Sequence, residues 1–312
     1  MTALQLSIQI VIYIAIGVFA RKLKVIGEGF DKSLSGFIVN FALPCMIIHS
    51  LSLPYSPDEL ANFPLLLGLA ILVCALLLGV GHLFYLGLGK TDVARVDRFG
   101  IYLSNFTFMG LPMVDALYGQ EGLFYFVIFT APIRVLYYSL VGPLLSPAGT
   151  GSRRRSRREV LKQWLNPPLA GVVVGLILYF TGLRLPGVLT NVVDGLSDVC
   201  SPMGMVLCGI TIGKYNLRSL VRPKYLRLPL LRDLLAPAVT LAVLWLLPID
   251  PMIKKVVVLY AALPCAGMLA TYTIQFNPNP EARLEASSAI LLSTLLSVAT
   301  IPLWAAVLDR VF

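Results

Sequence analysis

The chain has 312 residues, of which 57% are hydrophobic and 13% charged, and its formal net charge is +9. A soluble domain carries roughly 25% charged residues, so this composition excludes an ordinary soluble protein and indicates several membrane-spanning segments. The positive charge does not indicate nucleic-acid binding, because the basic residues are spread over several loops instead of forming one patch.

Ten apolar segments follow one another along the chain, and most reach the roughly 20 residues that a bilayer requires. The first segment is followed by Arg21, Lys22 and Lys24 and has no basic residue before it. A cleaved signal peptide has the opposite charge order, so we expect this segment to remain as the first membrane helix. The predicted segments are 4–21, 33–52, 63–89, 98–118, 122–145, 164–182, 187–212, 229–247, 254–275 and 285–308.

The basic residues indicate how these segments are oriented. Most follow the first, third, fifth, seventh and ninth segments, and the densest run is RRRSRR in the 146–163 loop. Loops rich in Lys and Arg stay in the cytoplasm, so we predict a multi-pass cell-membrane protein with both termini outside. The 146–163 loop is then a short basic cytoplasmic loop that contacts anionic membrane lipid.

Prolines at matching places indicate an internal repeat. They lie in the second and fourth segments of each half, at Pro44, Pro112, Pro202 and Pro264. Each half then has five helices, and this odd number makes the second half enter the membrane from the opposite side. We predict an all-α polytopic membrane protein with ten transmembrane helices in a five-plus-five inverted repeat, residues 1–145 and 164–312.

The stretch SNFTFMGLPMV, residues 104–114, lies in the middle of the fourth segment. We expect Gly110 and Pro112 to break this helix near mid-membrane, as Pro264 breaks the ninth, because proline removes a backbone donor. The half-helices after the breaks then present N–H groups around Met113 and residues 265–267, and two such positive ends suit a small anion. The alternative is an ordinary kink without a site, since many membrane helices tolerate proline.

Several motifs together resemble the auxin efflux carrier family. They are SNFTFMGLPMVDALYGQEGL, LSDVCSPMGMVLCGITIG, and AALPCAGMLATYTIQF followed by EASSAILLSTLLSVATIPL, and the resemblance extends over nearly the whole chain. The resemblance implies ten helices in which the fourth and ninth cross at their breaks. It also implies a scaffold of helices 1, 2, 6 and 7 and a moving transport core of helices 3–5 and 8–10. The short central loop is similar to that of bacterial members, which are regarded as organic-anion permeases.

Single polar residues in the apolar segments are candidates for the substrate site. Arg134 suits a substrate carboxylate, although it could instead pair with Asp115 or Asp198 or with exposed carbonyls. Asn105 lies two turns before Pro112, and Thr294 either binds substrate or bonds back to its own helix. The predicted substrate-binding residues are Asn105, Gly110, Pro112, Met113, Arg134, Pro264, Cys265, Ala266, Gly267 and Thr294. Arg232 lies near a helix start, where we expect it to snorkel toward the interface.

Enzymatic chemistry has little support in the sequence. Asp194 and Asp198 form DGLSD without a second acidic cluster, and His49 and His82 stand alone in apolar helices. The five cysteines form no CxxC pair, so we predict no metal, no disulfide and no cofactor.

We therefore predict a secondary carrier for small organic anions such as carboxylates, working by alternating access of the elevator type. One alternative is a sodium-coupled organic-acid symporter, in which Asp115 and Asp198 are the candidates for ion or proton coupling. Another is a membrane sensor that binds without transport. The sequence leaves open whether the chain forms a homodimer.

Overall fold

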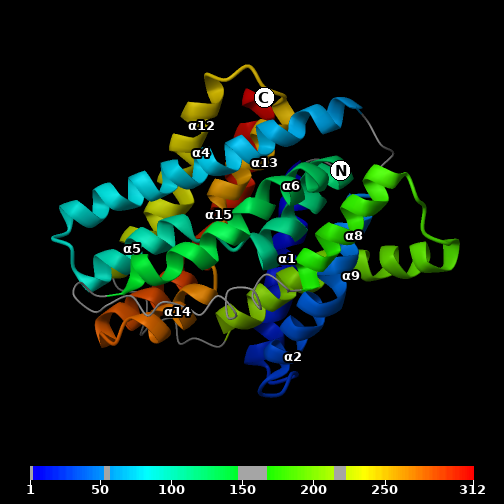
Figure 1. The fold of residues 1–312 in the computed structure, drawn as a ribbon. Coiled ribbons are helices and arrows are strands. Elements are labelled where there is room, and N and C mark those ends of the chain that lie inside the picture. Colours follow the sequence, from blue (N-terminus) through cyan, green and yellow to red (C-terminus); the bar gives the residue numbers. More distant parts are fainter. Residues whose placement is uncertain (1–2, 53–56, 147–166, 214–222) are drawn as a thin grey trace. The chain divides into compact units, whose positions relative to one another are not determined.

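The computed structural model describes residues 3–52, 57–146, 167–213 and 223–312. The described residues form helices joined by short loops, with no strand among them, so the all-α prediction is confirmed (Figure 1). The predicted basic loop at 146–163 lies, apart from its first residue, outside the described residues.

Five helical stretches in the described part of the chain are long and apolar enough to cross a bilayer. They are Phe30–Ser50, Ala61–Gly87, Gly187–Gly213, Pro223–Trp245 and Pro280–Val311, and Pro167–Thr181 is a shorter apolar helix. These helices make the chain a multi-pass membrane protein, whereas ten crossings and their inverted arrangement stay predictions.

The structure forms two compact units, each of which takes segments from both halves of the sequence. The first unit comprises Met1–Leu69, Thr107–Pro132 and Leu161–Lys214. Its helices are α1 (Ala3–Lys22), α2 (Phe30–Phe37), the π-helix η1 (Ile38–Ala42), α3 (Leu43–Ser50), the start of α4 (Pro57–Gly87), part of α6 (Leu111–Leu145), α8 (Pro167–Thr181) and α9 (Gly187–Gly213).

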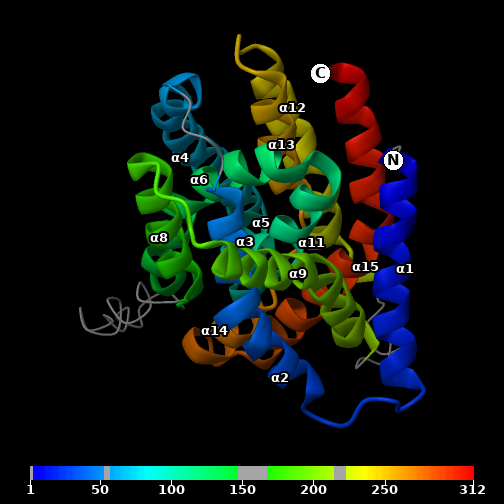
Figure 2. The same ribbon diagram turned by 90° about the vertical axis from the view of Figure 1, so that its right-hand side faces the viewer.

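Small residues allow α1 to pack closely against α9 in the first unit, and Figure 2 shows α1 as one continuous helix. A Cβ on Gly17 would collide with the carbonyl oxygen of Val206, and one on Gly209 would collide with that of Ile14. The other face of α1 carries exposed apolar side chains at helical spacing, Ile8, Ile12, Ile16 and Phe19. Such a face suits contact with lipid chains.

The second unit comprises Ala70–Phe106, Ile133–Val160 and Tyr215–Phe312. In addition to the remaining parts of α4 and α6 it contains α5 (Asp92–Tyr102), the start of the π-helix η2 (Phe106–Gly110), the 3₁₀-helix η3 (Pro223–Tyr225), α11 (Arg227–Leu230), the π-helix η4 (Leu231–Leu235), α12 (Ala236–Trp245), α13 (Pro251–Ala262), α14 (Met268–Phe276) and α15 (Pro280–Val311). The α12 and α13 helices lie side by side (Figures 1 and 2).

Local sequence explains where several of these helices start and stop. Asp250 caps α13 by accepting a hydrogen bond from the N–H of Met252 at 2.7 Å, and Asn279 caps α15 in the same way. A proline follows each cap at the first helical position, where no N–H is required. Gly119, with φ of 63°, separates α6 into two helices, which matches the expected boundary between the fourth and fifth segments.

The three π-helices share one cause. Each ends two residues before a proline, at Pro44, Pro112 and Pro237. A proline offers no N–H and its ring clashes with the carbonyl four residues earlier, and the wider turn relieves this clash without ending the helix. Pro202 likewise lies inside the continuous helix α9.

Candidate functional site

Two helix breaks meet in the second unit, one between α5 and η2 and the other between α13 and α14. The backbone N–H of Asn105 donates to the carbonyl of Pro264 at 2.8 Å, and the N–H of Ala266 donates to that of Leu103 at 3.2 Å. Ser104 and Cys265 face each other in this short antiparallel pairing. We call residues 103–105 and 263–267 the crossover.

The first of these breaks lies earlier in the chain than the sequence suggested. We expected Gly110 and Pro112 to interrupt the helix, but Gly110 ends the π-helix η2 and Pro112 is the second residue of α6. The interruption comes at residues 103–105, so the prediction for Pro112 was wrong in position. The break at Pro264 is where the sequence placed it.

A hydroxyl from α15 supports the crossover. Ser293 accepts a hydrogen bond from the backbone N–H of Cys265 at 3.0 Å, and both residues are fully buried. Thr294, which was predicted as a substrate contact, donates to the carbonyl of Ile290 at 2.7 Å. Thr294 thus makes the bond to its own helix that was the alternative, and Ser293 is the neighbour that reaches the crossover.

An aromatic cluster packs against the crossover. The hydroxyl of Tyr137 accepts from the N–H of Ser104 at 2.8 Å and shares a hydrogen bond with the hydroxyl of Tyr260 at 2.7 Å. Phe106, the first residue of η2, lies against both tyrosine rings. These contacts fix the start of η2 in a buried setting.

The guanidinium of Arg134 lies over the ring of Phe106, with 4.6 Å between its central carbon and the ring centroid. The residue is only 9% exposed, so its charge is held in a largely apolar setting where a cation–π contact is favourable. A positive side chain therefore stands at the N-terminal end of η2, the end at which the helix dipole is also positive.

The half-helix after the second break, α14, also has an accessible N-terminus. No side chain caps the N-terminus of α14 at Gly267, and both Gly267 and Met268 are exposed. Asn105 at the opposite break is half-buried. The N–H groups in the first turn of a helix have no intrahelical acceptor, so this region can donate hydrogen bonds to an anionic oxygen.

Sequence reasoning also placed Arg232 wrongly. It does not snorkel to an interface, because its side chain is fully buried and donates to carbonyl oxygens of Ile101, Tyr260 and Leu263. These carbonyls belong to the C-terminal ends of α5 and α13, immediately before the two breaks. A charged residue five positions before Pro237 was the available signal, although its target depends on the fold.

The other predicted residues lie in the first unit. Met113 is buried in α6, and Asp115 accepts a hydrogen bond from the hydroxyl of Ser201 at 2.9 Å. His49 is not alone as we expected, since its Nδ1 lies 2.7 Å from a carboxylate oxygen of Asp194. That pair links α3 to α9, and it includes one of the two acids of DGLSD. The roles of Asp115 and Asp198 in ion or proton coupling stay predictions.

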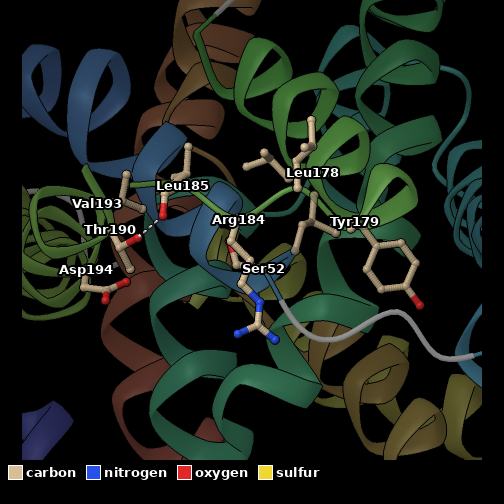
Figure 3. Close-up of a pocket in the computed structure, with 11 residues that line it drawn as sticks. Ser52, Leu178, Tyr179, Arg184, Leu185, Thr190, Val193 and Asp194 are labelled. Carbon is tan, nitrogen blue, oxygen red and sulfur yellow. Dashed lines mark hydrogen bonds between the residues drawn. The ribbon is translucent and has the colours of Figure 1, made fainter. Parts of the chain in front are cut away.

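The first unit also contains a cavity of about 420 Å³, shown in Figure 3. Arg184 and Asp194 contribute charged groups to its lining, and Thr190 donates to the carbonyl of Leu185 at its edge. The predicted substrate-binding residues do not line this cavity in the described part of the chain. The apolar side chains of Leu178 and Val193 complete a wall of mixed character.

The chain is similar in sequence to several known proteins. The chain is 28% identical over 309 residues to an "Uncharacterized transporter" of Methanothermobacter thermautotrophicus, which covers 96% of this chain and 97% of the relative. It is 25% identical to a "Putative malonate transporter" of Rhizobium meliloti, over 86% of this chain and 84% of that protein. It is also 24% identical to the mouse "Lysosomal cholesterol signaling protein", of which it covers 34%.

The family model described as "Membrane transport protein" matches residues 2–305, nearly the whole length. The match confirms the resemblance to the auxin efflux carrier family that the motifs indicated. This chain therefore belongs to the membrane transport protein family, the family of the auxin efflux carriers.

Proposed function

We propose that this protein is a secondary carrier for small organic anions such as carboxylates, which bind at the crossover. The observation that carries the proposal is the arrangement of charge there. The uncapped helix α14 starts directly after Gly267 on one side of the pairing, and η2 starts beside Arg134 on the other. Both features are positive, and both lie next to one short pairing of broken helices.

The chemistry of a carboxylate suits this arrangement. Each carboxylate oxygen accepts hydrogen bonds from backbone N–H groups, and a guanidinium binds both oxygens at once. We propose that the side-chain amide of Asn105 and the backbone N–H of Gly267 donate to the anion beside Cys265 and Ala266, whose own N–H groups already bond to Ser293 and Leu103, and that Arg134 neutralises it. The name of the Rhizobium relative, which refers to malonate, points to the same class of substrate.

The proposed mechanism is alternating access of the elevator type within a ten-helix inverted repeat. Of the ten predicted transmembrane segments, the third to fifth and the eighth to tenth form the moving core in this proposal. The first, second, sixth and seventh form the scaffold. Broken helices near the membrane midplane are typical of carriers that alternate in this way. Both termini lie outside in this arrangement, as the distribution of Lys and Arg indicates.

Uptake of radiolabelled malonate by proteoliposomes that contain the purified full chain tests the proposal. We expect saturable uptake that unlabelled small carboxylates compete with and that organic amines of the same size do not. Liposomes without protein and liposomes with the Gly68→Ala variant, whose added methyl group meets open space, serve as controls. Binding of malonate without flux would instead favour a sensor, and absence of binding by every carboxylate would overturn the substrate class.

A further inference from the structure

A fully buried arginine lies at the crossover and has no role in the proposed binding of the anion. Arg232 extends from the π-helix η4 and has no exposed surface. Burial of a charge in a membrane protein is costly, so such a residue generally has a function and defined partners. The hydrogen-bond partners of Arg232 are unusual, because they are all backbone carbonyls.

Three nitrogen atoms of the guanidinium each donate to a different carbonyl oxygen. Nη1 lies 2.6 Å from the carbonyl of Ile101, Nε lies 2.8 Å from that of Leu263, and Nη2 lies 3.1 Å from that of Tyr260. In the described part of the chain, no carboxylate forms an ion pair with Arg232. The hydrogen bonds of Arg232 thus go to backbone dipoles, and the buried carboxylate of the adjacent Asp233 also interacts with its charge.

These carbonyls come from the last turns of two helices that stop at the breaks. Ile101 is in the last turn of α5, and Tyr260 and Leu263 are at the end of α13. The last carbonyls of a helix have no intrahelical donor, and the helix dipole makes this end negative. Two such ends side by side form a site for a cation, and unwound carbonyls of broken helices coordinate sodium or protons in other carriers.

The position of η4 explains how the side chain reaches this place. Pro237 follows the π-helix and offers no N–H to the carbonyl of Asp233, and the indole Nε1 of Trp304 donates to that carbonyl instead, at 2.9 Å. A tryptophan from α15 thus replaces the missing donor and holds the wide turn in place. The turn is pinned next to the crossover, so Arg232 is positioned before any ligand arrives.

We propose that Arg232 is a built-in cation that occupies the carbonyl site of the crossover, so that binding of the organic anion requires no sodium ion there. This inference rests on the proposed function. If the protein is a carrier, an arginine in the carbonyl site makes it a carrier without sodium coupling at that site. The guanidinium balances the negative ends of α5 and α13, and the positive ends of η2 and α14 then stay available to the anion.

The thermal stability of the purified full chain in detergent, measured without any substrate, tests the proposal. The variants are Arg232→Met, Arg232→Lys and Arg232→Ala, and Arg310→Met at the exposed end of α15 is the control. Each is measured in choline chloride, sodium chloride and choline chloride with millimolar guanidinium, at equal ionic strength.

We expect the Tm of the unchanged protein to be the same in sodium and in choline. Arg232→Met should lower the Tm by about 5 °C or more, because it leaves the buried carbonyls of Ile101 and Leu263 without this donor and leaves Tyr260 only the N–H of Leu263 at 3.4 Å. Arg232→Lys should lose less, since it keeps the charge. Arg232→Ala vacates the site, so guanidinium should restore at least half of its loss, and the Arg310→Met control should not respond.

Three results would overturn the proposal: a sodium-dependent Tm in the unchanged protein, equal losses for Arg232→Lys and Arg232→Met, or no rescue of Arg232→Ala by guanidinium. Where Arg232→Ala does not fold, the comparison of lysine with methionine decides. Because no substrate is present, these results are independent of the malonate experiment. Failure of malonate binding with normal guanidinium rescue would refute only the proposed substrate.

Discussion

The backbone N–H of Asn105 donates to the carbonyl of Pro264 at 2.8 Å, and this bond joins two helix breaks that lie 159 positions apart in the sequence. The bond satisfies one free group at each break, which would otherwise cost free energy in a membrane interior. The two breaks therefore stabilise each other, and a change at either one should be felt at both.

Pro264 and Pro112 should behave differently on replacement by alanine. Pro264 lies in the crossover, so Pro264→Ala allows the break to heal and should weaken malonate binding by about 1–3 kcal/mol. Pro112 lies inside a continuous helix, and Pro112→Ala should leave the affinity nearly unchanged. Isothermal titration of both variants checks this. An equal loss for both would restore Pro112 as a part of the site.

Arg134 should act through its charge. Arg134→Ala removes the guanidinium beside Phe106 and should weaken malonate binding by about 2 kcal/mol or more, as loss of a buried charge partner does. Arg134→Lys should lose less, because it keeps the charge without the planar fork. Arg310→Ala is the matched control at an exposed position. Unchanged affinity in Arg134→Ala with a normal Tm would show that the anion binds elsewhere.

The two neighbouring hydroxyls of α15 should contribute unequally to stability. Ser293→Ala leaves the N–H of Cys265 without its acceptor and should lower the free energy of unfolding by about 1–3 kcal/mol. Thr294→Val removes a bond only to its own helix and should cost less. Thermal unfolding measures both, and malonate titration of the valine variant tests the earlier assignment. A large loss of affinity in Thr294→Val would support a substrate contact.

Close packing of α1 on α9 should make Gly209 sensitive to a single methyl group. Gly209→Ala places a Cβ against the backbone of Ile14 and should destabilise the protein by about 1–3 kcal/mol. Gly68→Ala meets open space and should leave stability unchanged or slightly higher. Thermal unfolding in detergent compares the pair. Equal stability of the two variants would contradict close packing of these helices.

The orientation in the membrane can be tested by cysteine labelling. In a chain without its five native cysteines, Ser152→Cys should react with an impermeant maleimide only from the cytoplasmic side, as the positive-inside rule requires. Arg310→Cys should react only from outside. The reverse accessibility at both positions would overturn the predicted orientation, and labelling of both from one side would overturn the inverted repeat.

Composition and motifs alone determined the class and the family of this protein. An apolar content of 57% with 13% charged residues is incompatible with a soluble domain, and backbone groups in a bilayer must bond within helices. The all-helical fold followed from these facts without knowledge of any contact. The break at Pro264 was also predictable, because a proline acts on its own helix.

Tertiary structure decided the features that depend on distant partners. Residues 103–105 contain neither proline nor glycine, and their backbone leaves the helix where it pairs with residues 264–266. Pro112 is a strong local signal for a helix break, but the π-helix η2 accommodates this proline without ending the helix. Arg232 reads as a snorkelling residue until the ends of α5 and α13 come within its reach, and His49 is isolated until α3 meets α9. A sequence pattern records what each residue does to its own segment, whereas Arg232 and Asp194 find their hydrogen-bond partners on segments that only folding brings close.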